Sequence, residues 1–210
     1  MMQMLEPVQA SGFLAAAVLV TLAPGPDNLM VLGLGLSRGR RQGVVFGLGC
    51  ALGCLSHTTL AALGIGALIA ASTVLFTALK VCGGLYLVWL GVQAWRAGGA
   101  VTVERQGGDD GLWRLFRRGL LANAINPKVV LFFLAFLPQF VDSARADVGW
   151  QTAQLGLLFT AQACLLFGAI GWFAGRLGGW LGRHGRVGPW LDRIAGGVFI
   201  ALGLRLIVAR

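Results

Sequence analysis

Residues 23–28, APGPDN, and residues 124–128, AINPK, decide how this chain folds. Both lie inside long apolar segments, where a proline removes a backbone donor and leaves carbonyl groups without partners. Inside a membrane such a break is tolerated only where the backbone faces protein or a water-filled cavity. Pro26 is typical of the first turn of a new helix, and Asn126 followed by Pro127 is typical of an N-cap and first helical position. The sequence therefore predicts two helices broken near their middles.

The composition places these helices in a lipid bilayer. The chain has 210 residues, of which 57% are hydrophobic and 12% are charged, with a mean hydropathy of +0.77. Soluble domains carry about 25% charged residues. The polar stretches between the apolar segments are too short to bury a core of their own. We expect one transmembrane domain over residues 1–210 and no separate soluble domain.

Six apolar segments are each long enough to cross a hydrocarbon core as a helix, which takes about 20 residues. They cover residues 12–36, 44–70, 73–95, 119–141, 150–174 and 194–209. The last is short and carries Arg205, so it either crosses the membrane or lies on its surface. Twelve arginines lie in the loops after the first, third and fifth segments, and three arginines lie on the other side. The positive-inside rule then places these loops in the cytoplasm and both termini outside. The net charge of +9 is thereby explained by topology, without a nucleic-acid partner.

An internal repeat divides the chain into halves of three segments each. Residues 80–87, KVCGGLYL, match residues 193–200, RIAGGVFI, position by position as basic, apolar, small, Gly, Gly, apolar, aromatic and apolar. The first half covers residues 12–95, the second covers residues 119–209, and a cytoplasmic loop of residues 96–118 joins them. Because three is odd, the halves are expected to be inverted relative to each other, as in many secondary transporters.

Each break is followed by an ionisable residue near the middle of its segment, Asp27 in the first half and Lys128 in the second. Charged groups at this depth are expensive unless they are partnered, and by default they indicate function. Asp27 could bind a substrate ammonium or a coupling proton, and Lys128 could bind a carboxylate. The alternative is a permanent structural ion pair, and both readings put the two groups close together. The candidate substrate-binding and coupling residues are Pro24, Gly25, Pro26, Asp27, Asn28, Asn123, Asn126, Pro127 and Lys128.

Three further residues are secondary candidates. Lys80 is either a snorkelling anchor or a site residue. His57 could relay a proton or serve as a hydrogen-bonded core histidine, and Tyr86 could line a path or only satisfy backbone groups. The four cysteines all lie inside apolar segments, with no disulfide framework and no zinc spacing. We expect no metal and no cofactor.

Other classes of protein fit the sequence less well. Residues 35–39, GLSRG, match the nucleophile-elbow pattern of hydrolases, but they lie where a membrane helix enters a basic loop, so an enzyme is not expected. An intramembrane thiol-redox carrier would need facing cysteines in the two halves, whereas Cys50 and Cys54 share one helix. A channel or ion transporter stays open, although charges at both breaks favour a gated site. Glycines over residues 39–53 serve helix packing within one chain or between two copies, so a homodimer also stays open.

The sequence also resembles a known family, the lysine exporter (LysE) superfamily, and in particular its homoserine/threonine (RhtB) branch. The similar stretches are residues 23–26, the glycine-rich second segment, residues 80–91 (KVCGGLYLVWLG), residues 119–142 (GLLANAINPKVVLFFLAFLPQFVD) and residues 196–203. The resemblance covers nearly the whole chain, and the Asn-Pro-Lys motif followed by Pro-Gln-Phe is its most specific part.

The resemblance implies a multi-pass exporter of amino acids or related metabolites in the bacterial inner membrane, driven by the proton-motive force. The implied motif positions are Pro24, Gly25, Pro26, Asn126, Pro127 and Lys128. Many members have Asn after the Pro-Gly-Pro, where this chain has Asp27, so the family does not vouch for Asp27 as the coupling carboxylate. We expect a secondary transporter that exports a small neutral amino acid, homoserine-, threonine- or leucine-like, in exchange for protons, with both termini in the periplasm.

Overall fold

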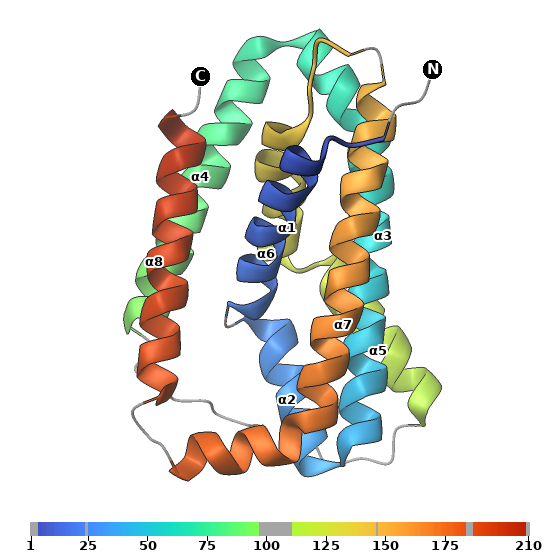
Figure 1. Cartoon of the computed structure of the whole chain (residues 1–210), viewed down its shortest axis with the longest axis vertical. Coiled ribbons are helices and arrows are strands. Elements are labelled where there is room, and N and C mark those ends of the chain that lie inside the picture. The colour runs from blue at the N-terminus through green and yellow to red at the C-terminus, as the bar shows by residue number, and fades with distance from the viewer. Residues whose placement is uncertain (1–3, 24, 97–110, 146, 184–186, 209–210) are drawn as a thin grey trace.

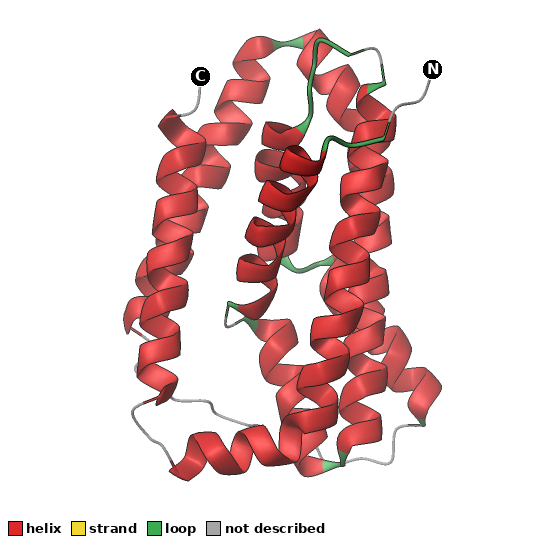
Figure 2. Ribbon diagram, viewed as in Figure 1, coloured by secondary structure: helices red, strands yellow, loops and turns green. Residues whose placement is uncertain are grey.

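The computed structural model describes residues 4–23, 25–96, 111–145, 147–183 and 187–208, and all regular structure in these ranges is helical (Figure 2). Pro24 and most of the predicted loop of residues 96–118 lie outside the described residues. The elements in chain order are α1 (Pro7–Leu22), α2 (Pro26–Ser37), α3 (Arg40–Ala71), α4 (Thr73–Arg96), α5 (Leu112–Ala124), α6 (Pro127–Leu131), the π-helix η1 (Phe132–Phe136), the 3-10 helix η2 (Leu137–Phe140), α7 (Val148–Arg183) and α8 (Val187–Val208).

Three helical stretches are long and apolar enough to cross a membrane by themselves, namely Arg40–Gly64, Val74–Arg96 and Val148–Ala174. Two bent pairs of helices raise the number of candidate spans to five if each pair counts as one span. Helix α8 covers the sixth predicted segment but is not one of these candidates in the described residues. The described residues thus give three to five candidate spans, and the predicted total of six is not reached.

Both helix breaks lie where the sequence predicts them. α1 and α2 meet at 57°, and α5 meets the segment Pro127–Phe140 at 48°. Pro26 stands in the first turn of α2. Asn126 is the N-cap of α6, and its side-chain oxygen accepts a hydrogen bond from the backbone N–H of Lys128 at 3.0 Å. The predicted cap chemistry of the second break is confirmed.

Several helices extend beyond the predicted apolar segments. α5 begins at Leu112, inside the predicted cytoplasmic loop, and α7 continues to Arg183. α8 begins at Val187 rather than at residue 194. Hydropathy marks only the part of a helix that suits hydrocarbon, whereas arginine, which is common in these extensions, is a good helix former in water. The end of α7 turns across the lower end of the molecule in Figure 1.

Helices of the first half pack against helices of the second half. α3 has its most extensive contacts with α7 and α5, and α4 pairs with α8 along one side of the molecule (Figure 1). Glycines allow the antiparallel α4–α8 pair to approach closely. A Cβ on Gly84 would lie 2.8 Å from the carbonyl oxygen of Gly203, and a Cβ on Gly91 would lie 2.6 Å from that of Gly196. Such backbone contact is typical of small-residue faces in membrane helices.

A polar network closes the end of the molecule at which α1 begins and α8 ends (Figure 1). The fully buried Gln151 donates to the backbone oxygen of Asp142 at 3.1 Å and to a carboxylate oxygen of Asp147 at 3.0 Å. Gln9 of α1 donates to the backbone oxygen of Phe140. The hydrogen bonds and charge of Asp147 raise the pKa of Arg145, its bidentate partner, above the ordinary value. The network fixes the starts of α1 and α7 to the end of η2.

Candidate functional site

A small buried cavity lies where the two breaks face each other. The residues that line it come from six helices and are Val20, Thr21, Asp27, Cys54, Asn123, Lys128, Val129, Phe159 and Phe167. Its volume is about 10 Å³, which is room for about one water molecule. An amino acid does not fit in this space, so the described conformation is closed around the breaks.

Lys128 reaches from the second break to the first. Its ammonium group donates to the backbone oxygens of Ala23 at 3.0 Å and Val20 at 3.2 Å. These carbonyls belong to the end of α1, where the helix leaves them without intrahelical partners. The absence of a side chain at Gly25 leaves room for the ammonium, because a Cβ there would lie 2.8 Å from Nζ. Lys128 is 5% exposed and serves as the cationic cap of α1.

Asp27 is bound by a residue that precedes the second break, whereas Lys128 follows that break. The side-chain amide of Asn123, on α5 before the second break, donates to Oδ2 of Asp27 at 2.8 Å. Asn123 is itself positioned by α3: the thiol of Cys54 donates to its side-chain oxygen at 3.3 Å, and Nε2 of His57 lies 3.2 Å from its backbone oxygen. Asp27 is 2% exposed, so its carboxylate is enclosed by protein.

The two charged groups share one cavity without a direct ion pair. Asp27 and Lys128 both line the cavity, so they are close together as the sequence predicts. Each nevertheless bonds to a neutral partner, an amide for Asp27 and backbone oxygens for Lys128. The alternative of a permanent ion pair between them is therefore not formed in this conformation. The cavity therefore has a negative pole at Asp27 and a positive pole at Lys128.

Thr21 connects two more amide side chains to the cavity. Asn28 donates through Nδ2 to the backbone oxygen of Thr21 at 2.7 Å, and Gln162 of α7 donates through Nε2 to the Thr21 hydroxyl at 2.8 Å. The other amide atom of each side chain, Oδ1 of Asn28 and Oε1 of Gln162, is buried without a hydrogen-bond partner. The same holds for Nδ2 of Asn126. Buried amide atoms are satisfied in the great majority of cases, so each of these exceptions calls for an explanation.

The remaining predicted residues lie at different distances from the cavity. Pro26 and Pro127 occupy first-turn positions of α2 and α6 and are exposed. His57 stands behind Asn123, with its ring centroid 5.6 Å from that of Phe133. Lys80 and Tyr86 lie on α4 and are not among the lining residues; the Lys80 ammonium is 5.9 Å from the Phe76 ring.

Sequence reasoning missed several lining residues. It did not single out Thr21, Phe159 or Phe167, and it treated Cys54 as a small hydrophobic residue. The spacing offered one signal, since Thr21 lies within one helical turn of the first break. No sequence signal distinguishes the two phenylalanines, because they lie in a long apolar run of α7.

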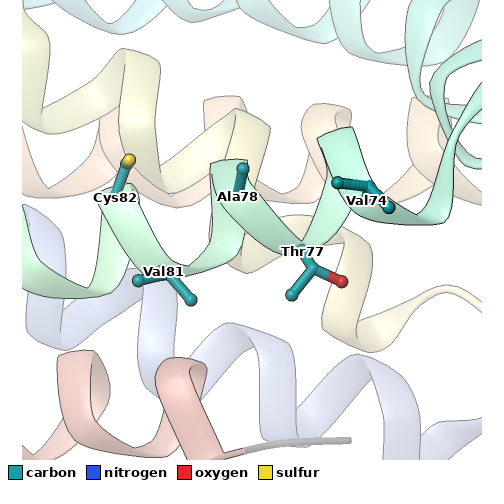
Figure 3. A pocket seen from close by; sticks show the side chains of 5 residues that line it. All are labelled: Val74, Thr77, Ala78, Val81 and Cys82. Atoms are coloured by element: carbon teal, nitrogen blue, oxygen red, sulfur yellow. The ribbon is translucent and has the colours of Figure 1, made fainter.

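A larger hollow on the surface lies on α4 and shares no lining residue with the buried cavity. One groove of about 510 Å³ follows a single face of α4 and is lined by Val74, Thr77, Ala78, Val81 and Cys82 (Figure 3). Its walls carry no charged group, which suits a surface in contact with lipid. No group of three or more His, Cys, Asp or Glu residues that could hold a metal ion occurs among the described residues.

Comparison with known proteins connects the chain to membrane exporters. Residues 18–210 match the family described as LysE type translocator. An uncharacterized membrane protein of Vibrio cholerae is 35% identical over 94% of this chain and 96% of its own length. The homoserine/homoserine lactone efflux protein of Salmonella typhimurium is 29% identical, with 94% and 95% covered. The threonine efflux protein of Escherichia coli K12 is 31% identical, with 92% and 94% covered. No solved structure matches the chain.

Proposed function

The chain belongs to the LysE type translocator family, and from this membership and the two facing breaks we propose that it exports a small neutral amino acid by proton antiport. The transported amino acid is homoserine-, threonine- or leucine-like. The names of the efflux relatives support the substrate class and the direction of transport. The chemistry of the cavity supports the site.

The observation that carries the proposal is the pair of opposite charges on one buried cavity. A neutral amino acid at physiological pH is a zwitterion, with one ammonium and one carboxylate. In this proposal Lys128 binds the carboxylate, and Asp27 binds the ammonium. A site with one acid and one base stays close to neutral when such a substrate enters, so no net charge is buried in the membrane. A cationic substrate would call for a second intramembrane carboxylate.

The N-termini of two helices contribute to the positive pole. α2 and α6 begin at the two breaks, and helix N-termini attract anionic groups through their free N–H groups and dipole. Asn126 adds an amide N–H₂ without a partner in the closed state. Gly25, Pro26, Asn28 and Pro127 shape these starts, and the candidate Pro24 lies outside the described residues.

Proton coupling is assigned to Asp27. When the ammonium of the substrate leaves, a proton can take its place on the carboxylate, so the return step carries a neutral Asp27 together with the single positive charge of Lys128. Exchange of a substrate ammonium for a proton on one carboxylate gives antiport, in which one net positive charge moves against each exported zwitterion. Lys128 needs no change of protonation during the return step.

The proposed transport also requires the two halves to move, so that the site opens to one side of the membrane at a time. We propose six spans in two inverted repeats, with the arginine-rich loops in the cytoplasm of a bacterium and both termini in the periplasm. The pairing of α4 with α8 through Gly84–Gly203 and Gly91–Gly196 supports such a relation between the halves. Because the closed cavity holds about one water molecule, the halves must separate at one end to admit substrate. The homodimer is a further proposal, and the experiment below separates an amino-acid exporter from the alternatives of a channel or a thiol-redox carrier.

The test is counterflow in proteoliposomes with a panel of radiolabelled amino acids, for the native protein and for Lys128→Ala, with and without an imposed pH gradient. We expect uptake of a small neutral amino acid that the gradient accelerates and the substitution abolishes. Exchange of inorganic ions alone would favour a channel or ion transporter. Folded protein that exchanges no amino acid would contradict the proposal.

A further inference from the structure

Two amide oxygens beside the cavity, Oδ1 of Asn28 and Oε1 of Gln162, have no role in the charge-binding scheme above. Both residues are more than nine-tenths buried, at 9% and 6% exposed, and neither oxygen has a hydrogen-bond partner. A buried unsatisfied oxygen is destabilising, because it loses its hydrogen bonds to water and gains none in the protein. Two such groups on one threonine call for an explanation.

Thr21 binds both of these amide groups. The amide nitrogen of Asn28 is 2.7 Å from its backbone oxygen, and that of Gln162 is 2.8 Å from its hydroxyl. In a planar amide the oxygen is bonded to the same carbon as the nitrogen, so both unpartnered oxygens lie near Thr21. Thr21 in turn lines the cavity.

Thr21 is the member of this group that lines the cavity, and the two amides lie behind it, outside the lining. Gln162 stands one helical turn after the lining residue Phe159, so it lies on the same face of α7. A substrate side chain that extends from a site between Asp27 and Lys128 toward Thr21 would approach the two amide groups that Thr21 binds.

We propose that Thr21, Asn28 and Gln162 form a subsite for a hydroxyl group on the substrate side chain, so that this exporter selects hydroxylated amino acids over aliphatic ones of the same size. The inference rests on the proposed function, since it names the substrate class of that site.

Charge argues against other occupants of the subsite. The three residues are neutral, and Asp27 and Lys128 already balance each other, so a metal cation would add an uncompensated charge in the membrane. The substrate ammonium is assigned to Asp27. A hydroxyl is both donor and acceptor: it can donate to an amide oxygen and accept from an amide N–H₂, so it suits either orientation of the Gln162 amide.

The subsite has a measurable consequence in substrate selection. A pocket that hydrogen-bonds a substrate hydroxyl rejects the analogue without it by up to about 10⁴-fold, because the polar groups of the pocket are then left unpaired. An aliphatic pocket cannot discriminate strongly between such pairs, with a limit near about 10²-fold.

The experiment compares two isosteric pairs, threonine with valine and homoserine with norvaline, in proteoliposome counterflow. The variants are Thr21→Val and Gln162→Met. Thr160→Val is the matched control, because the Thr160 hydroxyl is buried on α7 but donates to the backbone oxygen of Gly156 in its own helix at 2.9 Å. Thr21→Ser keeps the hydroxyl and serves as the rescue variant.

We expect the native protein, Thr160→Val and Thr21→Ser to prefer the hydroxylated member of each pair at least about tenfold. Thr21→Val and Gln162→Met are expected to bring the ratio near one. Equal exchange of both members by the native protein, or an unchanged ratio in Thr21→Val and Gln162→Met, would overturn the subsite and leave the proposed function standing. A native protein that exchanges no amino acid would overturn both.

Discussion

The two breaks differ in sequence, cap and charge. The first has Gly25 as an extended N-cap without a side-chain cap and leads into α2, a regular helix of 12 residues that begins with an acid at its second position. The second has Asn126 as a bonded N-cap and leads into α6, which has only five α-helical residues before the π-helix η1. The second break carries a base where the first carries an acid.

Polar groups at each break have their hydrogen-bond partners at the other break. Lys128, after the second break, caps the carbonyls of Val20 and Ala23 before the first. Asn123, before the second break, holds Asp27 after the first. Each break thus depends partly on hydrogen bonds from the other half, so separation of the halves must release hydrogen bonds at both. In the proposed mechanism, the ammonium and carboxylate of the substrate replace both partners at once, which couples substrate binding to movement.

The strongest way to break this reciprocity is to remove the cation. Lys128→Met leaves the carbonyls of Val20 and Ala23 unpartnered and Asp27 without a balancing charge. We expect exchange to fall at least 100-fold, and the unfolding free energy in detergent to fall by about 3 kcal/mol, the scale of losing hydrogen bonds to a charged group. Counterflow and equilibrium unfolding measure the two effects. Retention of near-native exchange would show that Lys128 has only a structural role.

Removal of the acid tests the negative pole. In Asp27→Asn the amide can still bond to Asn123, but it can exchange neither an ammonium nor a proton. Exchange is expected to fall about tenfold or more, the scale of one interaction with a charged group, and the imposed pH gradient should no longer accelerate it. Asp27→Glu is the matched variant that keeps the charge. If the pH gradient still accelerates transport in Asp27→Asn, the coupling role belongs to another residue.

A smaller change, at the first break, tests how closely Lys128 fits against Gly25. The Cβ of Gly25→Ala would push against the Lys128 ammonium, 2.8 Å away, and shift it from the α1 carbonyls. The lysine end can move, so we expect slower exchange, by several-fold, with little loss of stability. Gly64→Ala is the control, because a Cβ there meets nothing within 4 Å. Equal rates in the two variants would show that the fit of Lys128 against Gly25 is unimportant.

The smallest expected effect concerns the cap that only the second break has. Asn126→Ala removes the side-chain oxygen that accepts from the Lys128 N–H, and loss of such an N-cap destabilises by about 1 kcal/mol. Asn126→Ser keeps a neutral acceptor at the N-cap and should lie closer to the native protein in equilibrium unfolding. A stability loss as large for Ser as for Ala would assign the role of Asn126 to its amide nitrogen.

The local chemistry of the breaks could be read from the sequence, but their partners could not. Pro26 in a first turn and Asn126 as an N-cap follow from rules that span a few residues, and both positions agree with the structure. The hydrogen bonds of Lys128 span 105 and 108 residues, and the bond from Asn123 to Asp27 spans 96. Composition and spacing carry no information on such pairings, although the repeat indicated that the two breaks correspond.

The helix ends were missed for a different reason. Hydropathy placed the fourth segment at residue 119, yet α5 begins at Leu112, because Arg114, Arg117 and Arg118 are unfavourable in lipid but favourable in a helix. Thr21 was missed because it is a single polar residue in an apolar run. Its significance depends on Gln162, which lies 141 residues away.

The central claim is that both charged groups bind the substrate, and thermal unfolding of the purified native protein with threonine and two of its analogues tests it most directly. The ligands are threonine, the amine that lacks its carboxylate, and the hydroxy acid that lacks its ammonium. A ligand that binds the folded state raises the unfolding temperature. The account predicts a rise with threonine and none with the amine or the acid at the same concentration. An equal rise with either analogue would contradict it, because one of the two charged groups would then play no part in binding.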